Sequence, residues 1–257
     1  MKDQVHPSAA AGYKTGADTY VRGRPDYPPQ VADWLTVTLE LNADRTVLDL
    51  GAGTGKFTGP LVATGAQVIA VEPVPQMLEK LCEAFPEVLA ASGTATDLPL
   101  PDASVDVVVC AQAFHWFAST EALTEIARVL KPGGKLGLVW NLRDAKVSWM
   151  PKLDAIVNAL EGDTPRYYTG AWREAFPHQA FGPLQVQYFS HGHTGSLEDV
   201  IFNRVRSISY IAALPVAERA KVDAQLRALI AGEPALRGRD VVTVPYETVA
   251  FVAVKGR

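Results

Sequence analysis

The 257-residue chain has little cysteine and no long apolar run. Its two cysteines, Cys82 and Cys110, are far apart and form no C-x-x-C pair, so a disulfide framework and a thiolate metal site are not indicated. Cys110 ends an apolar segment, which favours a buried, reduced thiol. No stretch approaches the ~18 apolar residues of a membrane span, and residues 1–20 lack the apolar core of a secretory signal. We therefore expect a cytoplasmic protein without a membrane partner.

Excess positive charge is also missing. The formal net charge is −4, which argues against a general nucleic-acid-binding protein. One segment differs from the rest, because residues 204–239 hold seven basic side chains and only three acidic ones before Asp240. Two interpretations stay open: a solvated helix face, or a cationic wall that faces a small anionic substrate.

The hydrophobic pattern alternates between short apolar runs and helical stripes. Strands are predicted at 46–50, 67–71, 88–91, 105–110 and 135–140, with helices near 54–64, 77–85 and 123–130 between them. This alternation predicts an α/β fold with a Rossmann-like, mostly parallel sheet and helices on both faces. A strand at 184–189, helices at 201–212 and 216–231 and a strand at 248–254 follow. Ligands of such sheets bind beyond the carboxyl ends of the strands.

Three alternate glycines, Gly51, Gly53 and Gly55, follow the first predicted strand. Glycine lets the backbone turn sharply and approach a ligand closely. The dinucleotide fingerprint would need its third glycine at Lys56, and the phosphate loop of ATPases would need Ser or Thr at Phe57. The run therefore matches neither motif.

Four segments together resemble class I S-adenosylmethionine-dependent methyltransferases: residues 48–55 (LDLGAGTG), 71–73 (VEP), 95–99 (ATDLP) and 128–134 (RVLKPGG). Residues 20–28 and 113–117 are similar to a small-molecule subgroup that includes trans-aconitate methyltransferase-like proteins. The resemblance implies S-adenosyl-L-methionine as cofactor and a seven-stranded sheet whose C-terminal strand is antiparallel. We expect one methyltransferase domain over 1–257, with a cofactor-binding core at about 45–140, an N-terminal lid at 1–30 and a substrate cover at about 141–240.

The resemblance also implies roles for acidic residues at the strand ends. Asp49 would receive the ammonium group of the cofactor or, alternatively, tie down the backbone N–H groups of the glycine loop. Glu72 would accept both ribose hydroxyls, Pro73 and Met77 would flank the adenine, and Asp97 would accept its amino group. The predicted cofactor-binding residues are Tyr20, Arg22, Asp49, Gly51, Ala52, Gly53, Thr54, Glu72, Pro73, Met77, Thr96, Asp97, Leu98, Ala111 and Gln112.

His115 is the predicted catalytic residue, since it follows the fourth strand and faces the expected methyl donor. It would act as a general base on a hydroxyl, a carboxyl or an enolisable carbon, or contact the substrate without proton transfer, or be a structural histidine. Methylation of a carboxylate needs no base, only alignment. The predicted substrate-binding residues are His115, Trp116, Trp140, Arg206 and Tyr210, with the Arg206 guanidinium gripping a substrate carboxylate.

A metal site is not predicted. His191 and His193 alternate along a strand and would point the same way, but no accompanying Cys or H-x-E pattern supports metal binding.

We therefore predict methyl transfer from S-adenosylmethionine to a small, anionic organic metabolite, with O-methylation of a carboxylate favoured. Two alternatives stay open: a nicotinamide-dependent oxidoreductase on the same topology, and a non-catalytic regulator that binds the cofactor. The absence of a Tyr-x-x-x-Lys pair after the fourth strand disfavours the oxidoreductase. No oligomeric state is predicted.

Overall fold

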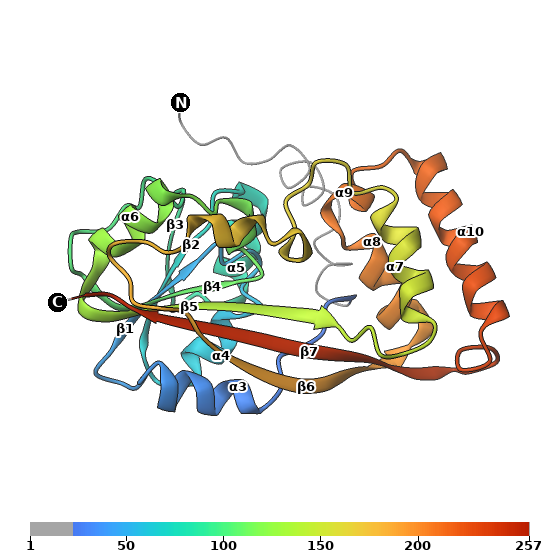
Figure 1. The fold of residues 1–257 in the computed structure, drawn as a ribbon, viewed down its shortest axis with the longest axis horizontal. Coiled ribbons are helices and arrows are strands. Elements are labelled where there is room, and N and C mark those ends of the chain that lie inside the picture. The colour runs from blue at the N-terminus through green and yellow to red at the C-terminus, as the bar shows by residue number, and fades with distance from the viewer. Residues whose placement is uncertain (1–22, 257) are drawn as a thin grey trace.

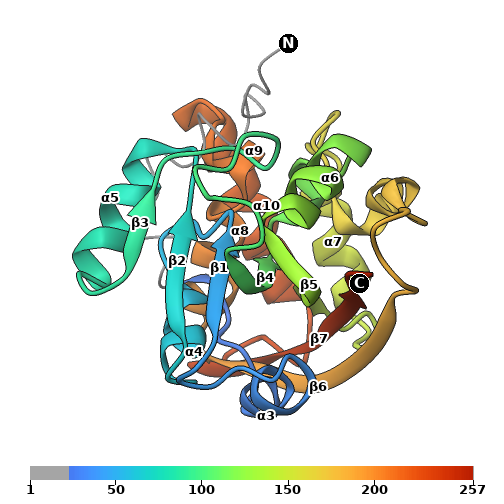
Figure 2. The ribbon, with the colours of Figure 1, turned by 90° about the vertical axis from the view of Figure 1, so that its left-hand side faces the viewer.

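The computed structural model describes residues 23–256, which build a single seven-stranded sheet (Figures 1 and 2). The strand order is β3-β2-β1-β4-β5-β7-β6. Strands β1 to β5 pair in parallel, whereas β7 runs antiparallel to both of its neighbours. The predicted Rossmann-like fold with an antiparallel C-terminal strand is confirmed. The strands are β1 (Thr46–Leu50), β2 (Gln67–Val71), β3 (Leu89–Ala91), β4 (Val105–Ala111), β5 (Leu130–Arg143), β6 (Gln185–Ser196) and β7 (Val241–Val254).

Helices cover both faces of the sheet. On one face lie α3 (Gln30–Asp33), the π-helical turn η1 (Trp34–Thr38), α4 (Thr58–Val62) and α5 (Pro75–Ala84). On the other face lies α6 (Thr120–Val129), whose N-cap Ser119 accepts a hydrogen bond from the Ala122 N–H at 3.1 Å. Helix α4 begins four residues later than predicted, because residues 54–57 still belong to the turn after β1.

Strand β4 is continuously apolar from Val107 to Ala111, after the charged Asp106 near its beginning. Val108 and Cys110 pack in the core beneath α6, while Val107 and Val109 pack in the core beneath η1 and α4. A strand that is covered on both faces alternates between two apolar environments and has no polar face. The central position of β4 in the sheet thus follows from its composition.

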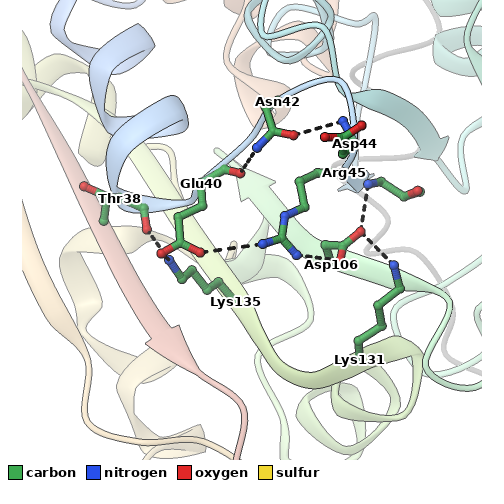
Figure 3. Close-up of polar contacts among 9 residues, drawn as sticks. Thr38, Glu40, Asn42, Asp44, Arg45, Asp106, Lys131 and Lys135 are labelled. Carbon is green, nitrogen blue, oxygen red and sulfur yellow. Dashed lines mark hydrogen bonds and ion pairs between the residues drawn. The ribbon is translucent and has the colours of Figure 1, made fainter.

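The amino end of the sheet is held by paired charges (Figure 3). The Asp106 carboxylate accepts hydrogen bonds from Arg45 Nη1 at 3.0 Å, the Thr46 N–H at 2.9 Å and Lys131 Nζ at 2.8 Å. Burial opposes its ionisation, but the hydrogen bonds from Lys131, Thr46 and Arg45 outweigh this and lower the pKa of Asp106. Glu40 pairs with Lys135 at 3.0 Å. These contacts join the amino ends of β1, β4 and β5, at the end of the sheet opposite the glycine loop.

The segment after β5 adds a second, largely helical layer with its own apolar cluster (Figure 1). The expected helix over 201–212 is divided into three pieces, and β6 and β7 extend well beyond the predicted strands. No helix within residues 23–256 is long and apolar enough to cross a membrane. The added elements are α7 (Met150–Asn158), η3 (Tyr167–Thr169), η4 (Ala171–Ala175), η5 (Glu198–Asn203), α8 (Arg204–Arg206), α9 (Ser209–Ala212) and α10 (Val216–Gly232).

Candidate functional site

A cavity of about 680 Å³ lies at the carboxyl ends of β1, β2 and β4. Its walls come from the segment before α3, the loop after β1, the end of β2, the segment after β4 and the region around η4. Parallel α/β sheets bind ligands at this edge. The cavity brings together these predicted site residues: Asp49, Gly51, Ala52, Gly53, Thr54, Glu72, Pro73, Met77, Ala111, Gln112, His115 and Trp116.

The three glycines of the loop have different roles, although all have positive φ angles of 72°, 60° and 88°. A Cβ on Gly51 would lie 2.7 Å from the Ala113 Cβ, and a Cβ on Gly55 would lie 2.7 Å from the Phe85 ring. Packing therefore requires both glycines. A Cβ on Gly53 would meet nothing nearer than the Met77 Cε at 3.6 Å, and Met77 lines the cavity. Gly53 is thus the glycine that keeps the cavity open.

Glu72 at the end of β2 holds the glycine loop in place. Its Oε2 accepts the Gly53 N–H and its Oε1 accepts the Val74 N–H, both at 2.9 Å. Burial raises the pKa of Glu72, and these two backbone hydrogen bonds limit the rise. Each carboxylate oxygen keeps a second lone pair, so the side chain still has acceptor capacity toward the cavity that it lines. Glu72 therefore accepts backbone N–H groups of the glycine loop, a role that the sequence offered as one alternative for Asp49.

Asp49 is almost fully buried, with 1% of its surface exposed. Its Oδ2 accepts a hydrogen bond from Thr58 Oγ1 at 2.7 Å, whereas its Oδ1 is buried and has no hydrogen-bond partner among residues 23–256. Burial raises the pKa of Asp49 to about 7, opposed by Thr58 and reinforced by the nearby Glu72. A buried acceptor without a donor is costly. The side chain is therefore suited to a cationic donor that enters the cavity.

Three predicted cofactor residues do not reach the cavity wall. Asp97 is exposed, Leu98 is buried in the apolar core, and Thr96 does not line the cavity either. The backbone turns back on itself here, since the Asp97 N–H donates to the Thr94 carbonyl at 3.2 Å. This turn carries Asp97 away from the strand ends. Gly93, Thr94 and Ala95 line the cavity instead.

His115 lies in the short helix η2 (Phe114–Trp116) after β4, at the cavity wall. The indole N–H of Trp140 donates to His115 Nδ1 at 3.0 Å. Because an indole nitrogen can only donate, Nδ1 carries the lone pair and the proton of the neutral ring is on Nε2. Burial, together with the charges of Arg166 and Arg24, lowers the pKa of His115 to about 3. In this state Nε2–H is a hydrogen-bond donor, which does not favour the predicted role of a general base.

A smaller chamber of about 80 Å³, called the side chamber below, adjoins the main cavity. Arg24, His115 and Arg204 are among the residues that line both spaces. The predicted substrate residues Trp140 and Tyr210 line the side chamber, and Trp116 lines both. Further residues that the sequence did not single out for substrate binding also line it, among them Arg143 and Arg166.

The structure places Arg206 away from both spaces, which corrects its predicted location. Its guanidinium pairs with Asp223 of α10 at 2.6 Å and with Glu198 at 2.5 Å. Successive helical residues are rotated by about 100°, so Arg206 points to a different side of the helix from Arg204. Arg204 belongs to the basic segment that the sequence offered as a cationic wall. The basic segment thus does contribute an arginine to the cavity wall, but it is Arg204 and not the predicted Arg206, two residues further along the chain.

Tyr20 and Arg22 lie outside the described residues. His191 and His193 both face the ring of Tyr246, and His191 Nε2 is 3.1 Å from Thr248 Oγ1. Within residues 23–256 there is no group of three or more His, Cys, Asp or Glu side chains that would hold a metal ion.

Comparisons with known proteins agree with this geometry. A family model described as a methyltransferase domain matches residues 48–138. An uncharacterized methyltransferase-like protein of Schizosaccharomyces pombe is 41% identical over 244 residues, 95% of this chain and 95% of its own length. An uncharacterized methyltransferase of Mycobacterium tuberculosis is 42% identical over 249 residues, 96% of each chain.

Solved structures share the fold at low identity. The YcgJ protein of Bacillus subtilis superposes with a TM-score of 0.54 at 21% identity, covering 89% of this chain and 99% of that one. Phosphoethanolamine N-methyltransferase 2 of Haemonchus contortus, in complex with phosphomonomethylethanolamine and S-adenosylhomocysteine, gives 0.55 at 16% identity, covering 95% of this chain and 57% of that one. Sequence relatives, shared fold and the strand-end cavity lead to one conclusion: the chain belongs to the class I S-adenosylmethionine-dependent methyltransferases.

Proposed function

We propose that the protein transfers the methyl group of S-adenosylmethionine to a small, anionic organic metabolite, and that a carboxylate oxygen receives it. The observation that carries the proposal is the continuity of the cavity. One space of about 680 Å³ runs from the glycine loop to His115 and Arg204. A volume of this size is typical of small-molecule sites, and here a carboxylate-lined end is joined to a cationic one.

The residues at the loop end suit the cofactor. Gly53 leaves room that a side chain would fill, and the unpartnered Asp49 Oδ1 suits the ammonium group of the methionine moiety. Glu72 keeps acceptor capacity for the ribose hydroxyls, and Met77 with Pro73 offers apolar surface for the adenine. We assign the neighbouring wall to Gly93–Ala95 in place of the predicted 96–98. The bound cofactor supplies a methyl group on an electrophilic sulfonium, and the protein contributes binding, alignment and exclusion of water.

The state of His115 supports a carboxylate acceptor. A hydroxyl or carbon acceptor must lose a proton around the time of methyl transfer, and His115 with its low pKa and occupied Nδ1 is a poor base. A carboxylate is already deprotonated at neutral pH. The Nε2–H of His115 is then a donor that orients the acceptor, which makes it a positioning residue.

We retain three further predictions as part of this proposal. Of the lid predicted over residues 1–30, the part up to residue 22 lies outside the described residues, and the part from residue 23 is supported as a lid by Arg24, Pro25 and Tyr27 in the cavity wall. Residues from about 141 to 240 form the substrate cover, which is supported by Trp172 and Arg204 in the same wall. The acceptor is a metabolite of the cytoplasm and not a nucleic acid, in line with the net charge of −4.

Calorimetry and a methyl-transfer screen test the proposal. S-adenosylhomocysteine should bind to the protein, and NAD should give no comparable heat. With labelled S-adenosylmethionine, a panel of small carboxylic acids should include acceptors that form base-labile methyl esters. Tight binding of NAD in place of S-adenosylhomocysteine would overturn the cofactor assignment. Methyl transfer only to amines or to carbon would overturn the carboxylate assignment.

A further inference from the structure

The side chamber has an unusual charge composition. Four arginines line it, and within residues 23–256 no Asp or Glu is among its lining residues. Two of the four have carboxylate partners behind them: Arg143 pairs with Asp154, and Arg166 pairs with Glu161 at 3.3 Å. The Arg24 Nη2 donates to the Ser207 carbonyl at 3.1 Å. These three guanidinium groups therefore have acceptors in the fold.

Arg204 is different. Its Nε and Nη1 are buried, and within residues 23–256 neither makes a hydrogen bond of ordinary geometry. Burial, together with the charges of Arg24 and Arg143, lowers the pKa of Arg204 to about 10, and the nearby Tyr246 hydroxyl limits this fall. A guanidinium with unsatisfied buried N–H groups is destabilising unless an acceptor reaches it. Its fork of donors matches the two oxygens of a carboxylate or of a phosphate.

The fold holds Arg24 and Arg204 together despite their like charges. Gly23 packs against the backbone where η5 meets α8, and a Cβ on Gly23 would lie 2.4 Å from the Asn203 carbonyl carbon and 2.6 Å from the Arg204 nitrogen. This close approach requires glycine. It fixes the residue before Arg24 against the residue before Arg204, so the backbones of the two arginines cannot separate without loss of packing.

We propose that the side chamber is an anion-binding subsite, in which Arg204, helped by Arg24, binds an oxyanion of the acceptor that does not receive the methyl group. The chamber adjoins the main cavity and shares lining residues with it, among them Arg24, His115 and Arg204. The acceptor therefore has an anionic group apart from its reacting atom. This inference rests on the proposed function, because it assumes that the acceptor enters from the main cavity. The recognised group is a carboxylate or a phosphate.

The test compares two arginines of one helix. Arg204→Met removes the unpartnered cation, and Arg206→Met removes a cation that pairs outside both spaces. With the S-adenosylhomocysteine-saturated protein, calorimetric titrations with succinate and with inorganic phosphate distinguish the two kinds of oxyanion. Arg204→Met should weaken the better of the two probes by about tenfold or more. Arg206→Met should leave its affinity within about twofold of the parent.

Thermal unfolding provides a second measurement that does not depend on ligand affinity. Without added anion, Arg204→Met should be at least as stable as the parent, because it loses a buried unpartnered charge. The preferred probe at high concentration should raise the melting temperature of the parent and not that of Arg204→Met. If Arg204 is structural, Arg204→Met melts lower in every buffer, and the proposal is overturned.

The possible failures are distinguishable. If S-adenosylhomocysteine does not bind to the parent protein, the proposed function fails. If it binds, but Arg204→Met and the parent bind both probes equally, the function stands and the subsite is wrong.

Discussion

The two ends of the sheet treat buried charge in opposite ways. At the amino end, Asp106 is 8% exposed and accepts three hydrogen bonds from its neighbours (Figure 3). At the carboxyl end, Asp49 is 1% exposed and one of its oxygens has no partner. Arg204 likewise has two buried nitrogens without partners among residues 23–256. The buried carboxylate at the amino end is satisfied within the chain, whereas two of the buried charged groups at the carboxyl end, Asp49 and Arg204, are satisfied only in part.

The difference separates groups that stabilise the fold from groups that bind ligands. Hydrogen bonds from its partners stabilise the ionised form of a buried carboxylate, and they lower the pKa of Asp106. Without partners, burial dominates and raises the pKa of Asp49 to about 7. A ligand of complementary charge that pairs with Asp49 or Arg204 recovers the desolvation free energy that these groups lose in the unliganded protein. Substitutions made in matched pairs at the two ends of the sheet test this difference.

The largest effect is expected from glycine substitutions at the two ends. Gly53 and Gly133 both have positive φ angles, 60° and 75°, so valine costs each about 1–2 kcal/mol of backbone strain. A Cβ on Gly133 would meet nothing within 4 Å, whereas one on Gly53 projects toward Met77 at the cavity wall. Gly53→Val should weaken S-adenosylhomocysteine binding in calorimetry by about a hundredfold or more, which is ~2.7 kcal/mol. Gly133→Val should lose stability but keep its affinity for S-adenosylhomocysteine. An equal loss of affinity in the two variants would contradict the assignment of the glycine loop to the cofactor.

A smaller effect is expected from removing one carboxylate at each end. Asp106→Asn removes the negative charge that Arg45 and Lys131 share and leaves them a single acceptor oxygen, and because both cations are partly exposed we expect a loss of about 1–2 kcal/mol. Asp49→Asn replaces a buried, half-satisfied carboxylate by a neutral group, so at pH 8 without ligand its stability should change by less than about 0.5 kcal/mol or rise. Urea unfolding measures both. A larger loss for Asp49→Asn would reverse the comparison.

The core of the fold was predictable because it depends on local patterns. The bounds of β1 and β2 agree with the predicted strands, since each is a short apolar run between polar turns. The apolar residues Val31, Trp34, Leu35 and Leu39 recur at helical spacing, and all four are buried. The position of each of these elements is determined by which side chains are buried, and apolar residue type predicts burial. Helix α8 was harder, because the π-helical turn η5 and the break before α9 interrupt the period of the helix.

The candidate site was predictable where backbone geometry decides it and not where tertiary pairing does. Gly51, Gly53 and Glu72 follow from the turn and the strand end. The choice between Arg204 and Arg206 depends on Asp223 and Glu198, and no local pattern states which arginine they engage. The state of His115 depends on Trp140, 25 residues away in the chain. Such pairings need the folded structure.

A pH effect of intermediate size should separate Asp49 from its surroundings. Its pKa of about 7 in the folded protein exceeds the ordinary value of 3.8, so unliganded stability from this group is lost as the pH rises from about 4 to 7. The neighbours that face it are Thr58 on α4, Glu72 after β2 and the Cys110 thiol on β4. An ammonium group that binds Asp49 requires the carboxylate. The affinity for S-adenosylhomocysteine should therefore rise up to about tenfold per pH unit below pH 7 and then level off.

Calorimetry in buffers of different ionisation enthalpy counts the protons released on binding. Near pH 6 the parent protein should release about one proton, and Asp49→Asn should release fewer. Because burial also raises the pKa of Glu72, Glu72→Gln is the matched control and should retain most of the release. Release that persists in Asp49→Asn and disappears in Glu72→Gln would move the titration to Glu72.

The smallest effect concerns a single proton on His115. While the Trp140 indole donates to Nδ1, the ring should stay neutral with its proton on Nε2 from pH 5 to 9. Trp140→Phe removes that donor, so both neutral tautomers should appear and the pKa of His115 should move toward its ordinary range. Long-range ¹H–¹⁵N spectra of histidine-labelled protein distinguish these states, with His115→Asn to assign the signal. A parent ring that protonates near pH 6.5 would show that His115 is not held as a donor, and would restore it as a candidate base.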